Sequence, residues 1–148
     1  MTILNRVFSE RERVTHATKT GTQMHLLLQR VVIDGDKYTG DTDLVSRIKN
    51  VPELHKFFVP NSKTEVPIAG TIHSRFVSRR IDRLVIDSNS QSILVLDYKT
   101  DTNKEVFYSK YIAQMREYIA LLRAIYPKHK IDAYILWTHD FSLEKLPL

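Results

Sequence analysis

The chain has 148 residues and no cysteine. This absence excludes disulfide bonds, cysteine nucleophiles, zinc–thiolate sites and iron–sulfur clusters. Only four glycines and five prolines interrupt the sequence, so we expect compact and well-separated helices and strands. The sequence also lacks an apolar run of about 18 residues, which predicts a chain without a transmembrane helix.

What is present indicates one folded domain. Charged residues make up 26% of the chain and hydrophobic residues 43%, a balance typical of globular proteins. The N-terminal sequence MTILNRVFSERERVTH carries charges where a signal peptide needs an apolar stretch, so we expect a cytoplasmic protein. Lys and Arg exceed Asp and Glu by 22 to 17, a modest excess that suits a polyanionic partner or an ordinary basic soluble protein.

The hydrophobic pattern divides the domain 1–148 into a helical N-terminal part, 1–60, and a core, 61–140. In the first part Thr20 is expected to cap the first of three helical stretches, which cover 21–30, 41–51 and 53–58, with a turn at 34–36. The core is expected to contain strands at 64–69, 71–87 and 92–99, a helix at 104–126 and a strand at 131–138. Pro67 favours an edge position for the first strand. The order predicts an α/β fold around a mixed sheet.

Two acidic residues on neighbouring strands carry the chemical information. Because side chains alternate along a strand, Asp97 and Lys99 are expected to share a face, either as a surface ion pair or as part of a site. Asp82, on the preceding strand, is expected to be partly buried and to repel Asp97. Lys99 or a divalent cation would relieve that repulsion, and carboxylate oxygens suit Mg²⁺ or Mn²⁺.

This pattern resembles a known family. Asp82 followed by Asp97-Tyr98-Lys99 is similar to the D…(D/E)-x-K signature of the PD-(D/E)XK nuclease superfamily. Three further matches, in the family's order, narrow the resemblance to the RecB-like nuclease domain of bacterial recombination helicase–nucleases. They are His25 in a G-x-x-x-H segment, Glu65 in the first core strand, and the Q-x-x-x-Y pair Gln114 and Tyr118.

The resemblance implies the PD-(D/E)XK core (helix, three-stranded antiparallel meander, helix, strand) and a metal-dependent DNA nuclease of repair, recombination or DNA degradation. It implies that His25, Asp82 and Asp97 bind Mg²⁺ or Mn²⁺ and that Lys99 orients water or stabilises the transition state. The same resemblance implies supporting roles. Gln114 and Tyr118 would brace the site or touch the substrate, and Glu65 would assist the metal site or orient Lys99 or a nearby arginine.

Basic side chains near these residues are the expected DNA contacts, with a merely solvated charged surface as the alternative. They are Arg79, Arg80, Arg83 and Lys104. Arg79 stands where the family usually has glycine. No G-x-x-x-x-G-K-[ST] stretch is present, so any helicase or other repair subunit would have to act in trans, and no membrane partner is expected.

Two other hypotheses compete with a nuclease. One is a catalytically silent or partner-dependent DNA-binding module on the same fold, and the other is a basic protein-interaction domain. The sequence leaves exonuclease and endonuclease activity equally open.

Overall fold

A computed structural model describes residues 21–148, so the proposed cap Thr20 and the N-terminal sequence before it lie outside the described residues. The described chain starts in a helix, 21–29. It continues through a small hairpin and two short helical elements, which are β1 (Val32–Asp34), β2 (Lys37–Thr39), α2 (Thr42–Lys49) and the 3₁₀ turn η1 (Pro52–Leu54). Among residues 21–148, no helix is long and apolar enough to cross a membrane.

The second part of the chain builds the main sheet and the long helix. Its elements are β3 (Lys63–Ile72), β4 (Arg75–Asp87), β5 (Ser92–Lys99), α3 (Lys104–Ile125), β6 (Lys130–Trp137) and β7 (Ser142–Lys145). The five strands form one sheet in sequence order, in which β5 and β6 are parallel and the other neighbours antiparallel. Helix α3 makes the crossover between the two parallel strands. The predicted mixed α/β fold is confirmed, as is the order of three antiparallel strands, a helix and a strand.

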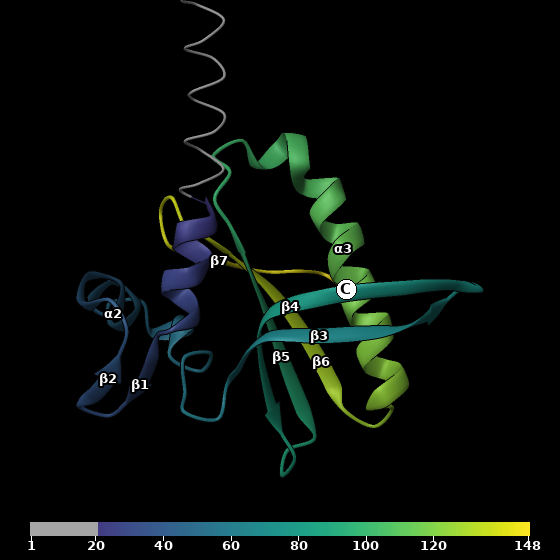
Figure 1. The fold of residues 1–148 in the computed structure, drawn as a ribbon, viewed down its shortest axis with the longest axis horizontal. Helices are drawn as coiled ribbons and strands as arrows, with labels where there is room; N and C mark the ends of the chain where they lie inside the picture. Colours follow the sequence, from purple (N-terminus) through teal and green to yellow (C-terminus); the bar gives the residue numbers. More distant parts are fainter. Residues whose placement is uncertain (1–20) are drawn as a thin grey trace, which may run out of the picture.

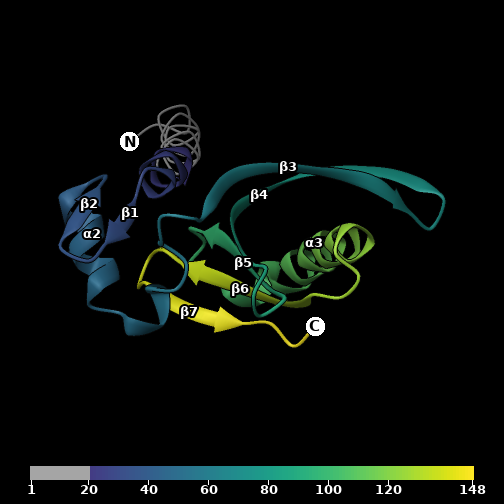
Figure 2. The ribbon, with the colours of Figure 1, turned by 90° about the horizontal axis from the view of Figure 1, so that it is seen from below.

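Helix α3 lies between two parts of the same sheet. The β3–β4 hairpin bends over one side of α3, and β5 and β6 pass on the other side (Figures 1 and 2). Gly70 allows the close approach, because a Cβ there would lie 2.9 Å from Leu121 Cδ2. The core between these layers includes Val77, Ile81 and Leu84 of β4 and Met115 and Tyr118 of α3.

Several local expectations were wrong, each because a tertiary contact or a weak turn signal decided the conformation. The helix expected at 53–58 is a single 3₁₀ turn, since the chain leaves it to bury Phe57 and Phe58, both fully inaccessible. Phe58 O then accepts a hydrogen bond of 2.8 Å from Ile33 N. The strand expected at 71–87 is interrupted at His73 and Ser74, whose φ angles of 48° and 63° form the hairpin turn. Strands β1, β2 and β7 have only three or four residues and were not expected.

A second core joins the N-terminal elements to the other side of the sheet, and Arg83 lies fully buried in it. Arg83 Nη2 donates to Leu28 O at 2.8 Å and to Val31 O at 3.0 Å. Its Nε donates to Tyr98 Oη at 2.9 Å, and its Nη1 donates to Ser62 Oγ at 2.6 Å. The expectation that Arg83 contacts DNA was therefore wrong, because this side chain has no surface to offer a phosphate.

The same contacts explain how a cation is tolerated in the core. The carbonyl end of helix 21–29 carries a partial negative charge, and the Arg83 guanidinium lies against it. The ring of Phe58 covers the guanidinium carbon at 4.2 Å. Arg83 thus fixes helix 21–29 to β4 and β5.

We expect Arg83→Met to lower the free energy of unfolding by about 3 kcal/mol or more, because each buried acceptor left without a donor costs about 1–3 kcal/mol. Urea unfolding of the full chain measures this loss. Arg80→Met is the matched control on the same strand, where the side chain is 67% exposed, and it should change stability by less than about 0.5 kcal/mol. Equal unfolding midpoints for the two variants would contradict the role given to Arg83.

Candidate active site

The site lies where β4 and β5 separate. Their pairing ends at Arg83 opposite Leu96, so Asp82 and Asp97 are the next residues in register and face the opening between the strands. Both are buried, with side chains 11% and 3% exposed. Asp82 Oδ2 accepts a hydrogen bond of 2.8 Å from Tyr98 N, a donor that the ended ladder would leave unpaired. The expectation that Asp82 is at least partly buried beside Asp97 is confirmed.

Strand β3 contributes a third acidic residue, in register with Asp82 and Asp97 across the three strands. The pairs Thr64–Arg83 and Val66–Ile81 leave Glu65 opposite Asp82. Glu65 has φ 51°, a left-handed conformation that costs a non-glycine residue about 1 kcal/mol or more. The Glu65 side chain is 30% exposed and its Oε2 lies 3.9 Å from Arg80 Nη1, so Glu65 stands beside the arginine rather than between the two aspartates.

The alternation of β4 also changes at this point. Ile81 and Leu84 pack into the same core although they are three residues apart, an arrangement that strict alternation forbids. Arg83, between them in sequence, points into the other core. The irregular backbone at Glu65 and Asp82 therefore sets the position of both carboxylates.

A chain of polar contacts runs from Asp97 to helix α3. Lys99 Nζ lies 2.8 Å from Asp97 Oδ2 and donates to Gln114 Oε1 at 2.9 Å. Gln114 Nε2 donates to Tyr118 Oη at 2.9 Å, and Tyr118 donates to Arg80 O at 3.0 Å. The predicted shared faces of Asp97 with Lys99 and of Gln114 with Tyr118 are confirmed. The chain returns to β4 and so restrains the Lys99 ammonium group.

Tyr111 of α3 also belongs to this arrangement. Its ring lies 4.2 Å from Lys99 Nζ, and its hydroxyl donates to Asp101 Oδ2. Tyr111, Gln114 and Tyr118 follow one another at i, i+3 and i+7, so their shared face was a signal in the sequence.

His25 closes the site from helix 21–29. Its Nδ1 lies 3.5 Å from Asp82 Oδ1, and its ring meets the Tyr98 ring edge-on at 5.4 Å between centroids. The His25 side chain is 34% exposed, so it stands between Asp82 and solvent. The structure therefore brings His25, Asp82, Asp97, Lys99, Gln114 and Tyr118 into one connected set, with Glu65 at its edge.

The remaining residues that were expected to contact DNA lie in two different places. Arg79 and Arg80 are on β4 close to Asp82, with side chains 41% and 67% exposed, and Arg79 Nε lies 2.8 Å from Glu117 Oε2. Lys104 Nζ lies 4.8 Å from the Trp137 ring and donates to Ser142 Oγ at 3.4 Å, so its charge is directed toward β6 and β7.

The charges within the site are strongly coupled. Burial, with the neighbouring Asp82 charge, raises the pKa of Asp97 to about 7 in spite of Lys99. Burial also acts to raise the pKa of Asp82, but hydrogen bonds from His25 and Tyr98 N and the bond with Asp97 outweigh it, so that this pKa is lowered. The hydrogen bond to Asp82 raises the pKa of His25. Below about pH 7 the two carboxyl groups therefore carry one shared proton between them.

The donors suit a hard divalent cation. Asp97 Oδ2 is buried and, although it is ion-paired with Lys99, it accepts no hydrogen bond from residues 21–148. Carboxylate oxygens with an imidazole nitrogen match the preferences of Mg²⁺ and Mn²⁺. As the side chains lie, however, no three or more His, Asp or Glu residues of the described chain are spaced to hold a metal ion. A cation would have to replace the shared proton and compete with Lys99 and His25 for these oxygens.

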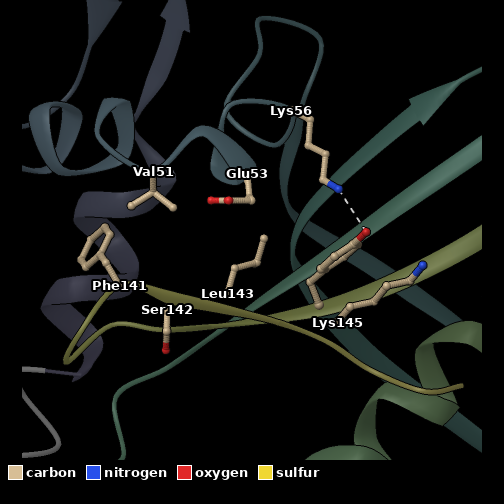
Figure 3. A pocket seen from close by; sticks show the side chains of 8 residues that line it. Val51, Glu53, Lys56, Phe141, Ser142, Leu143 and Lys145 are labelled. Atoms are coloured by element: carbon tan, nitrogen blue, oxygen red, sulfur yellow. Dashed lines mark hydrogen bonds between the residues drawn. The ribbon is translucent and has the colours of Figure 1, made fainter.

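A separate cavity of about 450 Å³ lies between η1 and β7, away from the carboxylate pair (Figure 3). Its charged lining residues are Glu53, Lys56 and Lys145, and Lys56 Nζ donates to Tyr134 Oη at 3.0 Å. This cavity carries one carboxylate and lacks the paired acids of the site.

No protein-family model matches the chain, and no curated protein matches it.

The shared proton makes stability depend on pH. The pKa of Asp97 is 3.8 in a free side chain and about 7 in the fold, so the folded state holds a proton that the unfolded state loses between these values. Its stabilising contribution is complete below 3.8 and is lost as the pH rises to about 7. We expect urea midpoints measured in EDTA to fall from about pH 5 to about pH 8, and Asp97→Asn to flatten this fall. A slope unchanged in Asp97→Asn would contradict the shared proton.

Proposed function

We propose that this protein is a metal-dependent DNA nuclease with a RecB-like PD-(D/E)XK core. The observation that supports it best is the buried Asp82–Asp97 pair with Lys99 beside it. Two buried acids beside a single lysine are an expensive arrangement for a protein core, and perturbed carboxylates of this kind are typical of functional sites. The order of the elements that carry Asp82, Asp97, Lys99 and Gln114 supports the same family.

In this proposal the two aspartates and His25 hold Mg²⁺ or Mn²⁺ between β4, β5 and helix 21–29. The bound cation would supply neutralisation of the scissile phosphate and activation of water. Lys99 would orient the attacking water or donate a hydrogen bond to the phosphate oxygen on which charge develops. Gln114, Tyr118 and the Tyr111 ring restrain Lys99 Nζ, so little side-chain freedom is left to lose when substrate binds.

Arg79 and Arg80 would contact phosphates beside the scissile bond, which gives an affinity that depends on salt and little on sequence. We propose that the protein acts in the cytoplasm, in DNA repair, recombination or DNA degradation. A helicase or another repair subunit is a suitable partner, because RecB-like nuclease domains act in helicase–nucleases.

We expect the full chain to cut DNA with Mg²⁺ or Mn²⁺, to stop when EDTA is added, and to lose about 100-fold or more in rate in Lys99→Ala. Digestion of linear and circular DNA, each single- and double-stranded, measures this rate. Nicking of circles would identify an endonuclease, and loss of linear DNA alone an exonuclease. Lys130→Ala is the matched control, because this lysine is exposed at the opposite end of the parallel pair from Lys99.

No cleavage of any of these substrates by folded protein would contradict the nuclease. A catalytically silent DNA-binding module is the second candidate. It is favoured because Lys99 and His25 already pair with the two aspartates, at the oxygens that a metal ion would need. Salt-dependent DNA binding without cleavage, unchanged in Lys99→Ala, would support that candidate instead.

A further inference from the structure

The β3–β4 hairpin reaches well beyond the site. We call residues 63–80, which comprise β3, the turn and the outer half of β4, the arm. The arm bends over α3 and its tip projects past the helix (Figures 1 and 2). The tip is a two-residue turn, His73 and Ser74, between the paired residues Ile72 and Arg75. A long, tightly closed hairpin of this kind can follow a ligand that extends away from the active site.

The arm concentrates positive charge. Residues 21–148 contain 18 Lys and Arg against 15 Asp and Glu, an excess of three. The arm alone has Lys63, Arg75, Arg79 and Arg80 against Glu65, which is the same excess. The rest of the described chain is therefore balanced, and a polyanion would be attracted to the arm.

The two faces of the arm differ. On the inner face Arg79 Nε lies 2.8 Å and Arg75 Nη2 3.6 Å from the carboxylate of Glu117 on α3. These pairs hold the arm to the helix. On the outer face, Arg80 pairs with Glu65 at 3.9 Å and its side chain is 67% exposed. Arg75 of the inner face is 72% exposed near the tip, so the arm offers an exposed cation on each face.

Phe76 is the feature that the fold alone does not explain. It is 72% exposed, more than any other large hydrophobic residue in the described chain. Its neighbour Val77 is buried against α3, so Phe76 points to the outer face, opposite the exposed Thr71. Arg80 follows Phe76 by four residues on that face. An exposed aromatic ring on an arm that carries arginines suits duplex DNA, because an apolar side chain can insert between base steps while cations pair with the phosphates.

The spacing gives this contact a position on DNA. Phe76 and Asp82 are six residues apart, which is about 20 Å along a strand at about 3.3 Å per residue. At a rise of about 3.4 Å, this corresponds to about six base pairs. We propose that the outer face of the arm binds duplex DNA about six base pairs from the scissile phosphate, with Phe76 packed against the bases. This inference rests on the proposed function for the position of the scissile phosphate.

The test compares DNA hairpins with stems of about 3 and about 20 base pairs, because only the longer stem extends from the scissile phosphate as far as Phe76. Binding to the full chain is measured in EDTA, so that it does not depend on cleavage. We expect Phe76→Ala to weaken binding of the long stem about tenfold, in line with the loss of one aromatic contact, and to leave the short stem unchanged. Arg80→Gln should weaken the long stem and reduce its salt dependence. Tyr38→Ala, an aromatic residue 44% exposed on β2, is the matched control and should change neither.

Wild-type affinity of Phe76→Ala for the long stem would overturn the proposal, as would equal losses on both stems. Sedimentation of the protein without DNA gives a further outcome. Self-association that Phe76→Ala abolishes, with DNA binding intact, would show that the outer face is a contact between copies of this chain and would overturn the proposal. The proposed nuclease activity can be contradicted independently of DNA binding by the arm. If no DNA is cut but the dependence on Phe76 and stem length holds, the DNA-binding arm stands and the catalytic assignment is contradicted.

Discussion

The hydrogen bonds of the buried Arg83 guanidinium hold helix 21–29 against β4 and β5, and the geometry of the candidate site depends on them. Arg83 binds the carbonyl end of helix 21–29 and the Tyr98 hydroxyl, and the neighbouring Asp82 meets His25 of that helix and the Tyr98 N–H. Two consecutive residues of β4 thus hold the same helix and the same residue of β5 from opposite sides of the sheet. Because charge in a core must be fully paired, this network allows little change in the position of His25.

Arg83 stabilises the fold, whereas the Asp82–Asp97 pair costs stability at the candidate site. Asp97 is held at a place where burial and Asp82 both oppose its charge, and Glu65 beside it has a left-handed backbone. Such local costs concentrate at functional sites, where the surrounding fold over-determines the geometry. Lys99 and a shared proton relieve the repulsion in the cation-free protein. Both would give way to a divalent cation, so metal binding and proton release are linked in this account.

Regular periodicity made the centre of the fold predictable. The apolar run 93–96 after a polar turn indicated β5, strand alternation gave the shared face of Asp97 and Lys99, and helical spacing gave that of Gln114 and Tyr118. The errors lie where periodicity fails. Arg83 has the sequence pattern of an exposed cation, and its burial is explained by acceptors that lie 15, 21, 52 and 55 residues away in sequence. Likewise, the turn at His73 and Ser74 lacks glycine, so nothing local marked it.

Anomalous X-ray diffraction from a crystal soaked in Mn²⁺ would show whether the aspartate pair binds a cation. We expect one strong peak between Asp82 and Asp97, within about 2.0–2.3 Å of an oxygen from each, with Lys99 Nζ moved away from Asp97 Oδ2. Asp97→Asn, soaked in the same way, should lose the peak. If the native protein shows no peak at this position and Lys99 Nζ stays 2.8 Å from Asp97 Oδ2, Asp82 and Asp97 do not form a metal site.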